Sequence, residues 1–136
     1  MADAFQLRVV TPKRLLLDEE VREVTAPGAA GEFGVLPNHI TFLGALEIGT
    51  LRYRSDRGPA QLAVRGGFAE VLDNVMTVLA DDAAFATDVD EAAAQNDLHN
   101  AEAQLKEHSP IDDAYATADA DRRWALARIE AARAAP

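Results

Sequence analysis

The sequence predicts an α+β fold that is mainly β, with an N-terminal antiparallel β-sandwich or barrel followed by a C-terminal antiparallel hairpin of two helices. Up to Ala86 the chain reads as short runs of alternating apolar and polar residues, with turn residues about every eight to twelve positions. From about Asp90 the apolar residues recur at helical spacing instead, alanine dominates and no glycine occurs. We therefore assign residues 1–86 to a β domain and residues 87–136 to a helical domain.

The strands of the β domain are predicted from alternation. Phe5, Leu7 and Val9 alternate with polar residues, as expected for a strand that buries one face. Residues 55–59 form a turn signal, and Asp73-Asn74 separates two apolar runs as the centre of a β-hairpin whose turn tolerates positive φ. Six or more such strands would bury one face of each of two packed sheets. The predicted strand segments are 5–9, 21–24, 46–54, 61–65, 67–72 and 75–80.

The segment from Gly31 to His39 is predicted to be a tightly turned, rigid loop. Glycines at positions 28, 31 and 34 permit backbone angles that other residues avoid, and Pro37 fixes its own φ and favours an extended conformation in the residue before it. Such a loop would present apolar side chains and the His39 imidazole in a fixed geometry. We expect it to be a contact surface.

The first predicted helix begins near Asp88 or Asp90, either of which can serve as an N-cap or a first-turn carboxylate. It ends before Ser109-Pro110, because proline removes a backbone donor and disfavours helical geometry at the preceding residue. Its apolar stripe is predicted to contain Ala94, Leu98, Ala101 and Leu105.

Asp112 or Asp113 is predicted to cap a second helix, antiparallel to the first. Both stripes use alanine where a strong bundle would use leucine, so at ~25 cal/mol per Å² the seam contributes only a few kcal/mol before ordering costs. The hairpin is therefore predicted to be marginal and able to rearrange. The stripe of the second helix is predicted to contain Tyr115, Ala118, Leu126 and Ile129, with Arg122 on the same face.

Composition excludes several classes of function. A net charge of −10 argues against nucleic-acid binding, which requires a basic surface. The absence of cysteine excludes disulfides and thiolate metal sites. The amino terminus lacks the basic and apolar regions of a signal peptide, and no apolar run is long enough to span a membrane, so we expect a soluble, cytoplasmic chain.

Charge is distributed unevenly along the helical region. Residues 81–113 carry ten carboxylates against the single basic residue Lys106, whereas residues 119–136 carry four arginines. An acidic segment followed by an arginine-bearing one can fold back on itself or offer the arginines to an acidic partner. Arg122 favours the second reading, because it interrupts an apolar face where a purely structural helix would place leucine.

Motifs for catalysis are missing. The sequence has no phosphate-binding loop, and its only serines, Ser55 and Ser109, lie in turns. His39 beside Glu32 could act as a general base, but the sequence offers no oxyanion device or metal to complete such a site. His99 and His108 are nine residues apart, on opposite sides of a helix, and cannot form a metal pair. We predict no catalytic residue, metal or cofactor.

Five features occur in a distinctive order: residues 9–12 (Val-Val-Thr-Pro), residues 31–39, Gly66-Gly67-Phe68, the strand at 75–80 and the alanine-rich tail. In this order they resemble the epsilon subunit of bacterial F-type ATP synthase over nearly the whole chain. The resemblance implies a β-sandwich of about ten strands and a two-helix hairpin. It also implies a non-catalytic rotor subunit of the central stalk, bound to gamma, alpha and beta subunits and to the c-subunit ring, at the cytoplasmic face of the bacterial inner membrane.

The resemblance also assigns residues to partners. Glu32 and His39 would face the polar loops of the c ring. Arg122, Arg123 and Arg128 would meet an acidic loop of the catalytic beta subunit and block ATP hydrolysis.

Some members of the family bind ATP through the motif I/L-D-x-x-R-A. Here the matching segment is residues 89–94, which keeps the aspartate as Asp90 but has Ala93 in place of the arginine. A methyl group cannot replace a guanidinium that pairs with phosphate. The resemblance therefore implies weak or absent ATP binding and no cofactor.

Two other functions remain open from the sequence. One is a free-standing β-sandwich adaptor, or protein-interaction module, with a helical tail. The other is a small hydrolase that uses His39.

Overall fold

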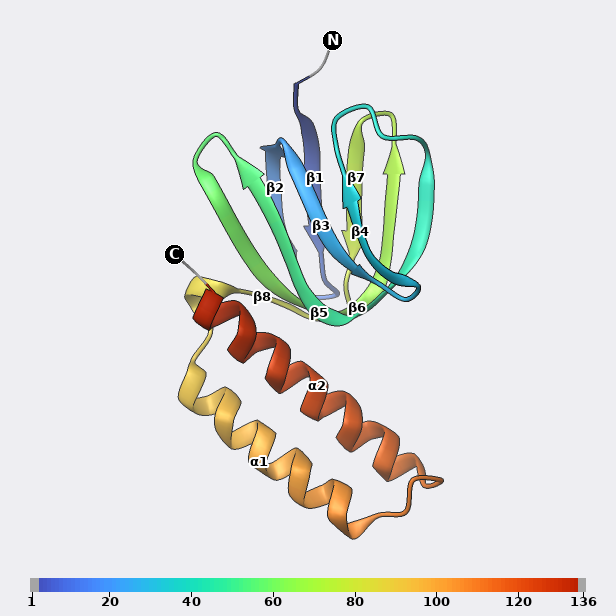
Figure 1. Cartoon of the computed structure of the whole chain (residues 1–136), viewed down its shortest axis with the longest axis vertical. Helices are drawn as coiled ribbons and strands as arrows, with labels where there is room; N and C mark the ends of the chain where they lie inside the picture. Colours follow the sequence, from blue (N-terminus) through green and yellow to red (C-terminus); the bar gives the residue numbers. More distant parts are fainter. Residues whose placement is uncertain (1–2, 135–136) are drawn as a thin grey trace.

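The computed structural model describes residues 3–134, which form a β domain with two antiparallel helices against one side of it (Figure 1). The predicted fold class is therefore confirmed. The strands are β1 (Phe5–Val10), β2 (Leu15–Val21), β3 (Glu23–Gly28), β4 (Gly31–Val35), β5 (Phe42–Ser55), β6 (Gly58–Leu72), β7 (Val75–Leu79) and β8 (Ala83–Phe85). A 3-10 turn, η1 (Ala86–Asp88), leads to α1 (Glu91–Glu107) and α2 (Asp113–Ala134).

The strands form one sheet in the order β2-β1-β7-β6-β5-β3-β4, with β8 paired to β6. The pairing is antiparallel except between β1 and β7, which run parallel and differ in this from the antiparallel prediction. The parallel pair aligns Leu7 with Met76 and Val9 with Val78, and all four side chains are buried. The parallel register thus places both strands' apolar residues in the same core.

Residues 3–134 contain eight strands instead of about ten, because β5 and β6 are long and β6 changes partner along its length. Residues 62–64 of β6 pair with β8, whereas residues 68–72 pair with β7. Gly66 and Gly67, with φ of 68° and 106°, lie between the two halves. The predicted strands 61–65 and 67–72 are therefore one strand that bends at this Gly-Gly pair.

Alternation places the core where the sequence predicted it. Phe5, Leu7 and Val9 are buried, and the predicted turn of the β6–β7 hairpin is confirmed, because Asp73 and Asn74 both have positive φ (50° and 64°). The largest fully buried side chains are Leu7, Leu51, Leu62, Met76, Val9, Val21, Val24, Val35, Val64, Val71 and Val78. The β domain thus has a core of leucine and valine.

The prediction of a continuous loop from Gly31 to His39 was wrong in its first half. Residues 31–35 are the strand β4, which forms a hairpin with β3 through a two-residue turn that pairs Gly28 with Gly31. Val35 is buried and Phe33 packs against the core, and these contacts outweigh the weak strand propensity of the glycines. Only residues 36–41 connect the strands β4 and β5.

Both helices begin and end close to the predicted positions. The Asp90 carboxylate accepts a hydrogen bond from the Ala93 backbone N–H at 3.0 Å, which confirms Asp90 as the N-cap of α1. Asp112 immediately precedes α2, but its carboxylate accepts a hydrogen bond from the Ser109 backbone N–H at 3.2 Å. That side chain therefore stabilises the connection between the helices.

The buried stripe of α1 contains Ala94 and Ala101, as predicted. In α2 the prediction was wrong at Leu126, which is 42% exposed, while Trp124 is buried. The reason is that α2 packs against the β domain as well as α1, and its buried face is shifted toward the sheet. The buried residues of α2 are Ala118, Trp124, Ala125, Ala127, Ile129 and Ala131.

Replacing Gly67 by alanine tests the bend in β6. A Cβ at Gly67 would lie 1.9 Å from the Leu79 carbonyl oxygen, in addition to the strain of its positive φ. We expect Gly67→Ala to lower the free energy of unfolding by about 2–6 kcal/mol, measured by urea denaturation.

Gly31→Ala is the matched control, because Gly31 also has positive φ (122°) but a Cβ there meets nothing within 4 Å. It should cost only the strain of the backbone, about 1–3 kcal/mol. Equal losses for the two variants would contradict the proposed close approach of β6 and β7.

Candidate functional site

The docked face of α2 holds a small apolar cluster centred on Trp124. Ala127 and Ala131 of α2 and Ala63 of β6 pack with Trp124 in this cluster, together with Ala86 of η1. One buried polar contact joins the same surfaces, because the Gln61 side-chain amide donates to the Ala131 carbonyl oxygen at 3.1 Å. That carbonyl belongs to the last turn of α2, where no helical N–H is left to bond it. The β domain therefore caps the carboxyl end of α2.

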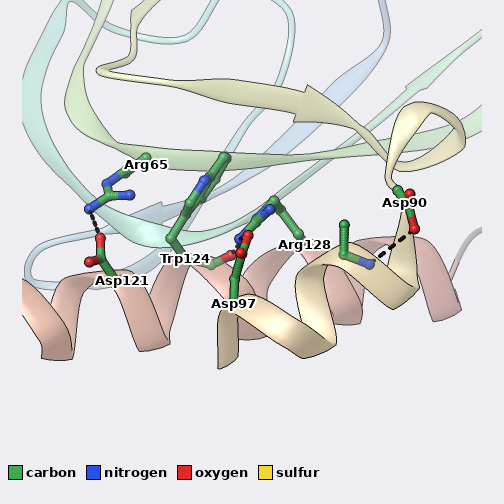
Figure 2. Close-up of polar contacts among 7 residues, drawn as sticks. Arg65, Asp90, Asp97, Asp121, Trp124 and Arg128 are labelled. Carbon is green, nitrogen blue, oxygen red and sulfur yellow. Dashed lines mark hydrogen bonds and ion pairs between the residues drawn. The ribbon is translucent and has the colours of Figure 1, made fainter. Parts of the chain in front are cut away.

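Ion pairs surround the cluster. The Arg123 guanidinium donates to the Glu47 carboxylate of β5 at 2.7 Å. In the opposite sense, Arg65 of β6 donates to the Asp121 carboxylate of α2 at 2.7 Å, as Figure 2 shows. These two pairs join α2 to the sheet. The helix contributes one cation and one anion, and so does the sheet. Neither pairing was predicted, because alternation and helical period give no register between a strand and a helix.

Arg128 is the most enclosed of the three arginines predicted to meet a partner. Its side chain is 17% exposed and donates to the Asp97 carboxylate of α1 at 2.9 Å (Figure 2). The guanidinium also lies 5.3 Å from the ring centroid of Trp124, in cation–π geometry. Arg128 thus connects α1, α2 and the apolar cluster.

Arg122 differs from the other two. Its guanidinium donates to the Asp119 carboxylate one turn earlier in the same helix, through Nη2 at 2.9 Å and Nε at 3.2 Å. The pair therefore lies wholly within α2 and does not depend on its contact with the sheet. The structure brings Arg123 and Arg128 onto other elements of the chain and leaves Arg122 paired within its own helix.

A cavity of about 340 Å³ lies between β6, α1 and α2, lined by residues that include Arg65, Asn100, Gln104 and Arg128. The guanidinium groups of Arg65 and Arg128 are paired with Asp121 and Asp97. Asp90, the aspartate of the degenerate ATP motif, uses its carboxylate to cap α1. The cations and the motif aspartate in this region thus already have partners within the chain.

Glu32 and His39 do not form a catalytic pair. Glu32 lies on β4 and pairs with Arg52 of β5 at 3.1 Å, with its side chain 57% exposed. His39 lies in the connection after β4, where Nδ1 is 2.8 Å from the Ile40 carbonyl oxygen and the ring meets Phe42 edge-on. Glu32 is therefore held by Arg52, and His39 by Ile40 and Phe42. The geometry therefore gives no support to a hydrolase.

The turn of the β6–β7 hairpin steadies the connection that carries His39. The Asn74 side-chain oxygen accepts from the Asn38 backbone N–H at 2.7 Å, and its amide donates to the Ala4 carbonyl oxygen at 2.9 Å. Asn38 itself has a positive φ of 63°. The predicted rigidity of this segment therefore has a physical basis in Asn74.

The β domain also exposes apolar side chains that the sequence patterns above did not predict. Leu43 of β5, Phe68 of β6 and Leu79 of β7 are 71%, 56% and 55% exposed and line one shallow cavity of about 110 Å³. We call these three residues the apolar patch. Phe68 precedes the buried Ala69, so it falls on the outward phase of its strand. Apolar residues at both the inward and the outward positions of a strand are the signal that could have predicted this patch.

Residues 3–134 hold no group of three or more histidines and carboxylates arranged to bind a metal ion. Within the same residues, neither helix combines the length and apolar character needed to cross a bilayer.

Comparison with known proteins identifies the family of this chain. Residues 4–86 match the family described as ATP synthase, Delta/Epsilon chain, beta-sandwich domain. The ATP synthase epsilon chain of Nitratidesulfovibrio vulgaris (strain DP4) is 46% identical over 95% of this chain and 97% of its own length. That of Geobacter metallireducens is 44% identical over 97% and 96%.

Solved structures share the fold. A chain in the structure of the Euglena gracilis mitochondrial ATP synthase with OSCP, F1 and the c-ring matches with a TM-score of 0.81 and 24% identity, covering 98% of this chain and 83% of that one. A chain in the central stalk and c-ring of the Tetrahymena thermophila mitochondrial ATP synthase matches with a TM-score of 0.58 and 16% identity, covering 93% and 95%.

The family match and the full-length relatives together define a non-catalytic ATP synthase subunit. The chain belongs to the ATP synthase delta/epsilon family, and the resemblance to an epsilon chain is confirmed.

Proposed function

We propose that the chain is a rotor subunit of the central stalk of a bacterial F1Fo ATP synthase, where it couples proton-driven rotation of the c ring to ATP synthesis. The observation that carries this proposal is the 46% identity to an ATP synthase epsilon chain over almost the full length of both chains. The protein would lie at the cytoplasmic face of the inner membrane, with membrane contact only through the complex. In this role residues 1–86 are the coupling domain and residues 87–136 the regulatory one, a division that stays a prediction.

Glu32 and His39 are the proposed contacts with the c ring. The exposure of Glu32 and the position of His39 in a short connection held by Asn74 support this assignment. A contact that transmits torque must resist deformation. A two-stranded hairpin followed by a pinned connection meets that requirement.

The apolar patch is the proposed contact with the gamma subunit. Three large apolar side chains at more than half exposure on neighbouring strands are costly in water and are typical of a surface that a partner covers. Because the docked hairpin lies against other residues of β5 and β6, this surface is free for a partner while the helices stay folded.

Arg122, Arg123 and Arg128 are the proposed inhibitory contacts with the beta subunit. Their helix is attached to the sheet through Trp124, small side chains and partly exposed ion pairs. This thin attachment supports a tail that leaves the sheet and offers its arginines to an acidic loop. Alpha and beta subunits would then be partners of the extended tail only.

A tagged pull-down tests the rotor assignment against the adaptor alternative. From solubilised membranes of the native host, the full chain should recover the alpha, beta and gamma subunits. Leu43→Asp/Phe68→Asp should reduce recovery of gamma at least about tenfold, because a charge on each of two buried contacts costs more than 1.4 kcal/mol.

Ile111→Asp is the control, because Ile111 is 91% exposed but lies in the connection between the helices, outside the apolar patch. It should leave the recovery of gamma unchanged. Recovery of unrelated soluble proteins by the wild-type chain would favour the adaptor and contradict the rotor assignment.

Charge reversal tests the inhibitory role. Replacing Arg122, Arg123 and Arg128 by glutamate should raise the ATP hydrolysis rate of the assembled complex, because like charges would face the acidic loop of the beta subunit. The rate of the wild-type complex is the reference, and Arg14→Glu, in the β1–β2 connection, controls for a charge reversal placed outside α2. Unchanged hydrolysis in the triple variant would refute the inhibitory contact.

Calorimetry tests the predicted loss of ATP binding. Because Asp90 caps α1 and Ala93 replaces the motif arginine, titration of the isolated chain with ATP should give no binding in the micromolar range. The matched variant Ala93→Arg restores the missing cation and should bind ATP more tightly than the wild-type chain. Micromolar affinity in the wild-type chain would overturn this prediction.

A further inference from the structure

Two of the three arginines proposed to meet the beta subunit are held by carboxylates from other elements. Arg123 donates to Glu47 of β5 at 2.7 Å, and Arg128 donates to Asp97 of α1 at 2.9 Å. Asp97 lies outside the degenerate ATP motif, and Glu47 lies in the β domain. Neither carboxylate belongs to the contacts proposed above with the c ring or gamma.

The Glu47 pair ties Arg123 to the sheet, and the Asp97 pair ties Arg128 to α1. A guanidinium that forms a strong hydrogen-bonded pair with one carboxylate gains less from a second, because the first already neutralises its charge. Arg128 is further enclosed by the Trp124 ring and is only 17% exposed. In the docked hairpin these two arginines are therefore poorly available to an acidic partner.

Arg122 provides an internal comparison. Its carboxylate, Asp119, is on the same helix and stays with it whether α2 is docked or not. The Arg65–Asp121 pair is a second comparison, since it also joins α2 to the sheet but involves no arginine of α2. The chain thus contains pairs that mask α2 arginines and pairs that do not.

We propose that Glu47 and Asp97 are masking carboxylates: they compete with an acidic partner for Arg123 and Arg128, and their two ion pairs keep α2 packed on the sheet and on α1, and inactive. The inhibitory half of this proposal rests on the function proposed above, whereas the docking half depends on the chain alone. Separation of α2 from both the sheet and α1 then exposes both arginines.

Trp124 makes docking measurable in the isolated full chain, because it is the only tryptophan and is buried against the sheet. The test variant is Glu47→Gln/Asp97→Asn, followed by Trp124 emission in a urea titration. Each partly exposed ion pair should shift the balance between docked and undocked hairpin by about two- to fivefold. The midpoint of the Trp124 transition should therefore fall.

The matched control is Glu23→Gln/Asp119→Asn. Glu23 pairs with Arg54 inside the sheet and is about as exposed as Glu47 (49% against 45%), and Asp119 pairs within α2. This control should leave the Trp124 midpoint unchanged. Equal midpoints for the test variant and the wild-type chain, or an equal shift in the control, would overturn the proposal.

A charge swap separates this proposal from the inhibitory function on which it partly rests. Glu47→Arg/Arg123→Glu should restore docking relative to either single variant, with the Trp124 midpoint as the readout.

In the assembled complex, Glu47→Gln/Asp97→Asn should lower ATP hydrolysis at least about twofold relative to wild type, because unmasked arginines bind the beta subunit more often. A shifted Trp124 midpoint with unchanged hydrolysis would support the docking pairs and refute inhibition by these arginines.

Discussion

The contact between α2 and the outer face of β5 and β6 governs the arrangement of the whole molecule. It is built from one large side chain, Trp124, set among alanines, with a single buried hydrogen bond from Gln61 and ion pairs at its edge. A buried methyl contributes about 0.8 kcal/mol, so alanine against alanine adds little per residue. Small side chains also let a helix approach and leave a sheet without repacking the core beneath it.

The β domain is built differently from this contact. Its core is one continuous cluster, mostly leucine and valine, to which the strands β1 to β7 all contribute. The Gly66-Gly67 bend lets one strand serve two pairings, and Asn74 ties a turn to two other segments. These features suit a domain that keeps its shape under load, while the helices depend on a thinner contact.

Local rules explain what the sequence predicted correctly. Alternation located Phe5, Leu7 and Val9, the Asp73-Asn74 turn follows from residues that tolerate positive φ, and Asp90 is a capping residue by its chemistry. Each of these depends on interactions within a few residues. The same rules predicted a β domain followed by a two-helix hairpin, and the resemblance to a known family added the link to ATP synthase.

What the sequence missed depends on contacts between distant segments. β4 is a strand because Val35 is buried in the core, although its glycines favour a loop. The stripe of α2 was misplaced at Leu126 because helical period alone does not show that the helix packs on two surfaces. The pairs of Arg123 with Glu47 and of Arg65 with Asp121 require the register of a helix on a sheet, which no local pattern contains.

The most direct test of this account is native-state hydrogen exchange of the full chain, because it gives a free energy of opening for each amide. If the helices are held by a thin contact on an independently stable sheet, the amides of α2 should exchange through an opening of lower free energy than those of β1, β6 and β7. That result would show that the hairpin can leave while the β domain stays folded. Equal protection of α2 and the core strands would mean that the chain opens as one unit, and would contradict the account.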